Sequence, residues 1–157
     1  MQTEWFRSTL QYDKMLENGC AKRVTEEYLV NAITVGDAER TLTMHMKQYI
    51  SGDFFVKKCA KQDFAEVLFG EGLGDYFWEV KLAFITLNEK SGEEKLTFRK
   101  CLIQADNLTD ALKATNKMME GSCLDYVFET ITRSKICDVF SDQTEFDFNN
   151  DDNDNGI

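Results

Sequence analysis

The sequence contains no proline and only one histidine, and its 18 basic side chains are outnumbered by 28 acidic ones. Without proline, no strand is interrupted by a residue that lacks a backbone donor. His45 has no serine, cysteine or carboxylate at the spacing of a catalytic motif, so we expect a helical residue at the core edge. The formal charge of −10 argues against a simple basic nucleic-acid binder and against a surface drawn to anionic lipid.

Long apolar runs and paired cysteines are also missing. No stretch of about 18 apolar residues occurs, and the N-terminus lacks the basic-then-apolar pattern of a signal peptide. We therefore expect a cytoplasmic protein without membrane contact. The cysteines are odd in number and lack C-x-x-C spacing, which argues against a disulfide framework and a zinc site and predicts reduced thiols. They are Cys20, Cys59, Cys101, Cys123 and Cys137.

The acidic side chains are concentrated at the C-terminal end. Residues 141–157 contain six of the 28 acids and no lysine or arginine. The remaining 22 acids stand against 18 basic residues, so residues 1–140 carry a formal charge of only −4. We predict a single domain over residues 1–140 and a flexible acidic tail over residues 141–157.

An internal repeat is the most informative pattern. Alternating apolar residues predict two pairs of strands, 72 and 73 positions apart: 5–12 with 77–84, and 24–32 with 97–105. Their apolar stripes are Phe6, Leu10 and Tyr12 with Tyr28, Val30 and Ala32 in the first half, and Trp78, Val80, Leu82 and Phe84 with Cys101, Ile103 and Ala105 in the second. The one-residue difference falls in the hairpin turns that contain Gly19 and Gly92. A slip inside a strand would turn every side chain to the wrong face, whereas a glycine turn tolerates it.

A helix and two further strands follow each predicted hairpin. Helices are predicted over 34–50 and 106–121, the second with Asp106 or Asn107 as its N-cap. Their apolar stripes are Ala38, Leu42, His45, Met46 and Tyr49, and Leu108, Ala111, Leu112, Thr115 and Met119. Extended segments follow at 54–59, 63–69, 125–133 and 135–140.

Each half therefore reads β-β-α-β-β. The first repeat covers about residues 5–69 and the second about residues 77–140, with the glycine-rich joint GEGLGD at 70–75 between them. The predicted fold class is α+β, an internally duplicated ββαββ repeat with a mostly antiparallel sheet and two helices on one face.

Three stretches carry a family resemblance: VTEEYLVNA (24–32), FITLNEKSGEEK (84–95) and ICDVF (136–140). In order and spacing they resemble a domain family of unknown function that is common in gut anaerobic bacteria, their phages and mobile elements. The resemblance covers about residues 5–140. Glu27 stands where the family usually has proline, which restores a backbone donor, so we expect different pairing at the start of that strand. The resemblance implies the fold and a mobile-element origin, and it implies no catalytic residues.

No residue pattern supports catalysis or a cofactor. The paired glutamates at 26–27 and 93–94 are typical of solvated strands and turns. The C-terminal DDNDNG lacks the downstream glutamate that completes a calcium loop, and GEGLGD lacks the Lys-Ser/Thr of a phosphate loop. We expect a protein that is not an enzyme and that has no catalytic residues, no cofactor and no metal site.

Aromatic and basic side chains form the candidate binding site. By strand alternation, Trp5 and Phe77 lie on the face opposite the apolar stripe, with Arg7 and Lys81 nearby. Such groups suit stacking of unpaired bases and contact with phosphates. The alternative is that both rings pack against the other half or in the seam of a homodimer. The predicted nucleic-acid-binding set is Trp5, Arg7, Lys57, Lys58, Phe77, Lys81, Arg99 and Lys100.

Two functional hypotheses remain open. The first is a non-catalytic phage or mobile-element protein that binds single-stranded nucleic acid. Its acidic tail, with Phe146 and Phe148 between acids, would compete for the basic residues. The second is a phage anti-defence protein that sequesters a nucleotide signal or blocks a host protein by acidic mimicry of DNA.

Overall fold

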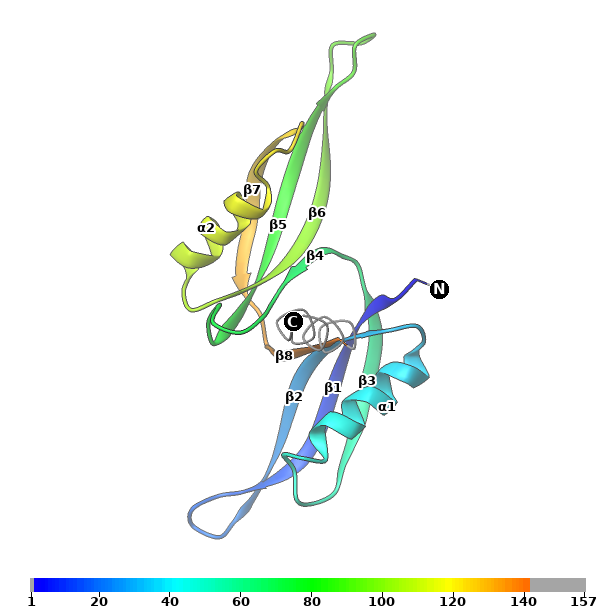
Figure 1. The fold of residues 1–157 in the computed structure, drawn as a ribbon, viewed down its shortest axis with the longest axis vertical. Helices are drawn as coiled ribbons and strands as arrows, with labels where there is room; N and C mark the ends of the chain where they lie inside the picture. Colours follow the sequence, from blue (N-terminus) through cyan, green and yellow to red (C-terminus); the bar gives the residue numbers. More distant parts are fainter. Residues whose placement is uncertain (1, 142–157) are drawn as a thin grey trace, which may run out of the picture. The chain divides into compact units, whose positions relative to one another are not determined.

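The computed structural model describes residues 2–141 as an α+β fold of eight strands in two sheets with two helices (Figure 1). The elements are β1 (Glu4–Met15), β2 (Ala21–Ala32), α1 (Val35–Met46), β3 (Phe54–Gln62), β4 (Phe64–Leu68), β5 (Tyr76–Leu87), β6 (Glu94–Ala105), α2 (Leu108–Met118), β7 (Asp125–Arg133) and β8 (Ile136–Ser141). They divide into unit 1, with residues 2–62 and 136–141, and unit 2, with residues 63–135. Apart from Ser141, the predicted acidic tail lies outside the described residues.

Unit 1 is a four-stranded sheet in the order β3-β1-β2-β8, with α1 along one face (Figure 1). Alternate residues of β1 and β2 meet the helix, because successive side chains of a strand point to opposite faces. This confirms the apolar stripe predicted for these strands. The buried cluster consists of Phe6, Leu10, Tyr28, Val30, Ala32, Ala38, Leu42 and Met46.

Unit 2 has the sheet order β4-β6-β5-β7, with α2 along one face (Figure 1). Its buried cluster is formed by Val80, Leu82, Phe84, Cys101 and Ile103. Asn107 is the N-cap of α2, and its side chain accepts a hydrogen bond of 2.9 Å from the backbone N–H of Asp110. This bond satisfies a donor that the first helical turn leaves unpaired. The N-cap predicted at 106 or 107 is therefore Asn107.

The strands form two sheets, whereas the sequence predicted one mostly antiparallel sheet with both helices on it. The last strand of each sequence half pairs in the other unit: β8 lies parallel to β2, and β4 lies parallel to β6. All other strand pairs are antiparallel. Parallel partners require a long connection, which the exchange of these two final strands supplies.

The ends of both helices differ from the prediction. Helix α1 ends at Met46, so Tyr49 leaves the apolar stripe and is 75% exposed. Leu108 opens α2 and is 47% exposed, while Ala111 and Thr115 are fully buried. His45 stacks on Phe140 with ring centroids 4.5 Å apart, which fits a residue at the core edge. Neither helix of residues 2–141 has the length and apolar character that crossing a membrane requires.

The edge strands β3 and β7 each contain a bulge at a matching position. In β3 the register skips Lys57, between the partners of Thr9 and Leu10. In β7 it skips Glu129, between the partners of Lys81 and Leu82. A bulge twists an edge strand locally and makes it a poorer template for pairing with another chain.

Candidate nucleic-acid interface

The candidate interface lies in unit 2, on the sheet face away from α2. Lys81 of β5 and Lys100 of β6 are direct partners across the two strands. Because Val80 and Leu82 belong to the cluster beneath α2, strand alternation places Lys81 on the opposite face. Next along the ladder, Ala83 pairs with Phe98, which brings an aromatic ring to the same face as the two lysines.

The Phe98 ring is both cation-bound and accessible. The Lys81 Nζ lies 4.7 Å from the centroid of this ring, within the range of a cation–π contact. Phe98 is nevertheless 49% exposed. An aromatic ring that stays half exposed beside cations is suited to stacking against an unpaired base.

The two lysines form an unfavourable pair in the unbound protein. Like charges directly opposite each other on neighbouring strands destabilise a sheet. Among residues 2–141, no carboxylate forms an ion pair with Lys81 or Lys100. The facing pair is therefore a local concentration of positive charge in a protein whose overall charge is negative.

A shallow pocket of about 520 Å³ opens beside these residues. Phe98, Lys81 and Lys100 line it together with the buried ring of Phe64 at the start of β4. Asp63 is its one acidic lining residue within the described chain. Its size falls within the range of small-molecule sites, and its open form also suits a segment of a longer ligand.

Arg99 is directed away from this lysine pair, although it borders the same pocket. Its guanidinium carbon lies 5.8 Å from the centroid of Phe84, a residue of the cluster beneath α2. With Met119 and Leu124 it lines a separate pocket of about 320 Å³. Adjacent residues of a strand face opposite ways, so the predicted pair Arg99–Lys100 is divided between two faces.

Phe77 is only 2% exposed and is therefore unavailable for stacking on an external base. This corrects its predicted binding role, because a buried ring offers no free face to a ligand. Trp5 is partly buried on β1, at the corresponding position of unit 1.

The predicted basic residues of unit 1 have other surroundings. Arg7 forms an ion pair of 3.1 Å with Glu27, and both side chains are largely buried. The register between β2 and β8 shifts next to Glu27, the residue for which different strand pairing was expected. Lys57 and Lys58 are exposed on the edge strand β3, at its bulge. The structure does not place either of them beside a predicted aromatic residue of unit 1.

The sequence analysis missed Phe98, although a signal for it was present. Phe98 stands two positions before Lys100, so strand alternation places both on one face. It also missed Asn31 and Gln104, because a single amide side chain within an apolar strand has no distinctive pattern.

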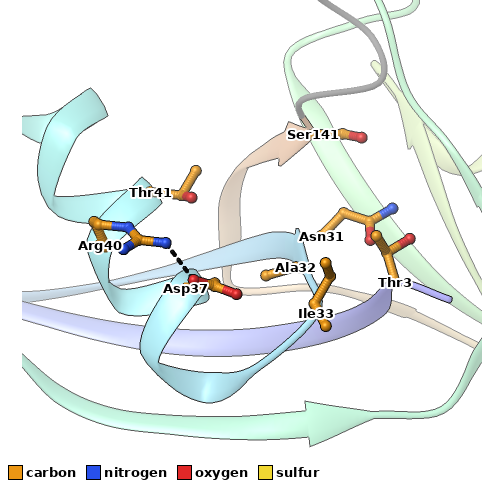
Figure 2. A pocket seen from close by; sticks show the side chains of 8 residues that line it. All are labelled: Thr3, Asn31, Ala32, Ile33, Asp37, Arg40, Thr41 and Ser141. Carbon is orange, nitrogen blue, oxygen red and sulfur yellow. Dashed lines mark hydrogen bonds and ion pairs between the residues drawn. The ribbon is translucent and has the colours of Figure 1, made fainter. Parts of the chain in front are cut away.

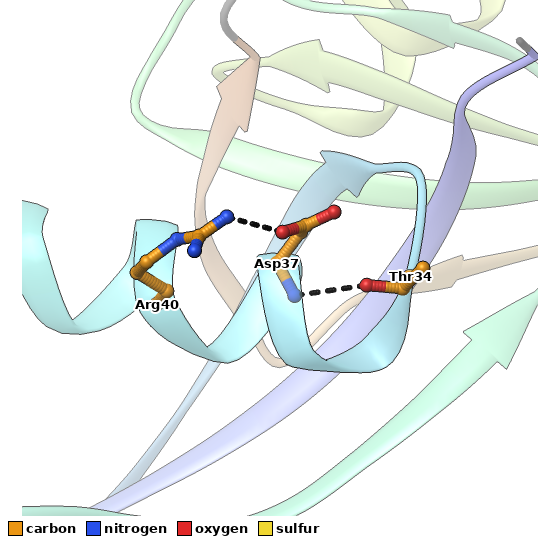
Figure 3. Close-up of polar contacts among 3 residues, drawn as sticks. All are labelled: Thr34, Asp37 and Arg40. Carbon is orange, nitrogen blue, oxygen red and sulfur yellow. Dashed lines mark hydrogen bonds and ion pairs between the residues drawn. The ribbon is translucent and has the colours of Figure 1, made fainter.

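Unit 1 has its own pocket, of about 280 Å³, at the end of β2 and the start of α1 (Figure 2). Asn31, Ala32 and Ile33 line it on one side, with Thr3 and Ser141 beside them. On the helix side, Arg40 forms an ion pair with Asp37, whose backbone N–H donates to Thr34 at 3.1 Å (Figure 3). These contacts hold the first turn of α1 at the pocket rim.

Comparison with protein-family models identifies the family of the chain. Its residues 4–142 match a domain of unknown function, DUF4494. The chain belongs to this family. This confirms the resemblance noted in the sequence, and the DUF4494 description carries no activity that bears on the lysine pair. No curated protein and no solved structure matches the chain.

Proposed function

We propose that this DUF4494 protein is a non-catalytic binding protein that holds single-stranded nucleic acid on the β5–β6 face of unit 2. The observation that carries the proposal is the facing pair of Lys81 and Lys100 next to the exposed ring of Phe98. A phosphate bound between the two ammonium groups would relieve their mutual repulsion. The free energy that this repulsion costs the unbound protein would then favour ligand binding. A base of the same strand would stack on Phe98.

The binding assay is fluorescence anisotropy with a short labelled single-stranded DNA at low salt. We expect binding at tens of micromolar or tighter for the full chain, and affinity about tenfold weaker after Lys81→Ala with Lys100→Ala. In this double variant the slope of log affinity against log salt concentration should also be shallower by about 1.4, because each contact with a single-strand phosphate contributes about 0.7 to the slope. Phe98→Ala should weaken binding without changing this slope.

A matched control removes the same charge elsewhere. Lys90 and Lys113 are both exposed in unit 2 and lie outside the pocket. Lys90→Ala with Lys113→Ala should leave the affinity within about twofold of the parent at moderate salt, because distant exposed charges are screened. If both double variants weaken binding equally, only net charge matters and the lysine-pair site is wrong.

The acidic C-terminal segment is proposed to regulate this binding. Its acids at 142–157 lie outside the described residues, so the argument rests on charge alone. Negative side chains do not attract phosphate and instead compete for the same lysines. Deleting residues 142–157 should tighten the DNA affinity at low salt, and high salt should shrink the difference.

A nucleotide-binding anti-defence protein remains the second candidate. The observation in its favour is the pocket of about 520 Å³, which has room for a single nucleotide between Phe64, Phe98 and the lysines. A thermal-shift screen with mononucleotides and cyclic nucleotides separates the candidates, because a ligand that binds only the folded state raises the melting temperature. A rise with a mononucleotide, combined with no DNA binding, would favour the second function.

We also infer that the two halves arose by duplication of a ββαββ segment in a phage or mobile element. Three features support the inference: the equal element order, the equal sheet order in the two units and the matching bulges at Lys57 and Glu129. The spacing of 72 residues between these two bulge positions equals the spacing of the repeat. The mobile-element origin rests on the resemblance alone.

A further inference from the structure

Asn31 and Gln104 occupy corresponding positions in the two units. Asn31 is the penultimate residue of β2, and Gln104 is the penultimate residue of β6. In both cases alanine ends the strand and a helix follows within three residues. Both residues also adjoin the end of a parallel edge strand, since Asn31 pairs with Ser141 of β8 and the residue before Gln104 pairs with Leu68 of β4.

In unit 2 the side-chain amide of Gln104 holds a peptide loop. Its Oε1 accepts a hydrogen bond of 2.9 Å from the backbone N–H of Gly70. Its Nε2 donates one of 2.7 Å to the carbonyl oxygen of Gly74. One amide thus binds both ends of a five-residue segment, through an N–H and through a C=O four residues later.

The same loop lies against the backbone at the end of β6. A Cβ on Gly74 would lie 2.4 Å from the backbone nitrogen of Asp106 and 2.5 Å from the carbonyl carbon of Ala105. Only glycine permits so close an approach of two backbone segments. The loop therefore rests on Ala105 and Asp106 while Gln104 holds it.

In unit 1 the corresponding place is the pocket of about 280 Å³ beside Asn31 (Figure 2). Ala32 and Ile33, the counterparts of Ala105 and Asp106, line it. The Asn31 Oδ1 is buried and accepts no hydrogen bond from any donor in residues 2–141. A buried acceptor without a donor costs free energy, so a rotation of the Asn31 side chain that brings its amide to a ligand donor in the pocket would remove this cost.

We propose that this pocket binds a glycine-containing peptide loop of a partner protein in the way that Gln104 holds residues 70–75. The peptide supplies a backbone N–H to Asn31 Oδ1 and a backbone C=O to Asn31 Nδ2. Glycine is required where the peptide crosses Ala32 and Ile33. This inference concerns unit 1 and is independent of nucleic-acid binding by unit 2.

The test uses NMR of the full ¹⁵N-labelled chain with a capped peptide of sequence Gly-Glu-Gly-Leu-Gly-Asp, which copies residues 70–75. At millimolar peptide, we expect the side-chain amide signals of Asn31 and the backbone amides of Ala32 and Ile33 to shift. Asn31→Ala should weaken binding about tenfold, and Asn31→Gln should retain it. The amide signals of Gln104, whose loop is already in place, should not move.

A second peptide provides the control. Alanine at its fifth position, which corresponds to Gly74, should abolish the shifts because its Cβ would meet the backbone below it. Equal binding of both peptides, or no shift with either, overturns the proposal. A different result would also contradict it. If the first peptide does not bind, and Asn31→Ala speeds hydrogen exchange only in residues 142–157, then the occupant of the pocket is this segment of the chain itself and not a partner protein.

Discussion

Tyr12 and Tyr28 donate their hydroxyl hydrogens to the two carboxylate oxygens of the same residue, Glu26. The three side chains come from β1 and β2 and lie on the sheet face that carries α1. The hydrogen bond to Glu26, followed by burial, raises the pKa of Tyr12 from 10.0 to about 12. Burial first, and then the same carboxylate, raise the pKa of Tyr28 well above its ordinary value.

These shifts predict a loss of stability at high pH. A tyrosine whose pKa is higher in the folded than in the unfolded state favours folding while it stays protonated. The contribution of Tyr12 is fully present below pH 10 and disappears as the pH rises to about 12. Urea unfolding should show the free energy of unfolding falling across this range, and Tyr12→Phe should reduce the fall. An identical alkaline decline in the parent and in Tyr12→Phe would show that this tyrosine is not coupled to folding.

Gly74→Ala should destabilise unit 2 by more than about 2 kcal/mol, because the new Cβ meets the backbone of Ala105 and Asp106. Gly19→Ala should cost about 1 kcal/mol, since its φ of 83° is unfavourable but nothing lies within 4 Å. Gly52→Ala should leave the free energy of unfolding nearly unchanged, because a Cβ at Gly52 meets no atom within 4 Å and Gly52 has no positive φ. Urea unfolding of the three variants checks the order, and a neutral Gly74→Ala would contradict the close contact.

Ala38 and Ala111 are fully buried near the start of α1 and α2. Replacing either with leucine should overpack the contact between helix and sheet and lower the free energy of unfolding by about 1–3 kcal/mol. Ala21→Leu is the control, because Ala21 is exposed at the start of β2. Thermal and urea unfolding of all three variants measure the effect. Parent-like stability of both buried variants would rule out close packing of the helices.

Lys57 and Lys58 are expected to protect the edge of the unit 1 sheet. They are exposed at the bulge of β3, next to Phe55, and lysine on an edge strand opposes pairing with another chain. Lys57→Val with Lys58→Val should raise light scattering of a concentrated solution over time, with little change in thermal stability. Lys113→Val with Lys117→Val removes the same charge from α2 and should scatter less; equal scattering would refute edge protection.

Local patterns predicted the two hairpins, the helices and the residues beneath them. Alternation assigned Val80, Leu82 and Phe84 to the core face, because the two-residue period of a strand can be recognised from a few neighbouring residues. The same alternation did not predict the burial of Phe77, since a period identifies a face of the sheet and not what covers that face.

The pairing of β4 and β8 was beyond such patterns. These are the shortest strands of the described chain, five and six residues long, and each forms its ladder with a strand far away in sequence. The backbone hydrogen bonds between two strands leave no signature in the sequence that identifies the partner strand. From the sequence alone, β4 and β8 could therefore each have paired with a strand of either half. The candidate site was predicted in part, because Lys81 and Lys100 were identified without the register that sets them opposite each other.

The exchange of final strands also predicts an order of assembly on the ribosome. Unit 2 is complete once residue 135 has emerged, whereas the sheet of unit 1 lacks its parallel edge until β8 follows. Residues 2–62 are synthesised first, but their sheet gains its fourth strand only when the last described strand has been made. Leu29, for example, precedes its partner Val139 by more than 100 residues. We expect the later-made unit to reach its native state earlier, a reversal of the usual N-terminal-first order of synthesis and folding.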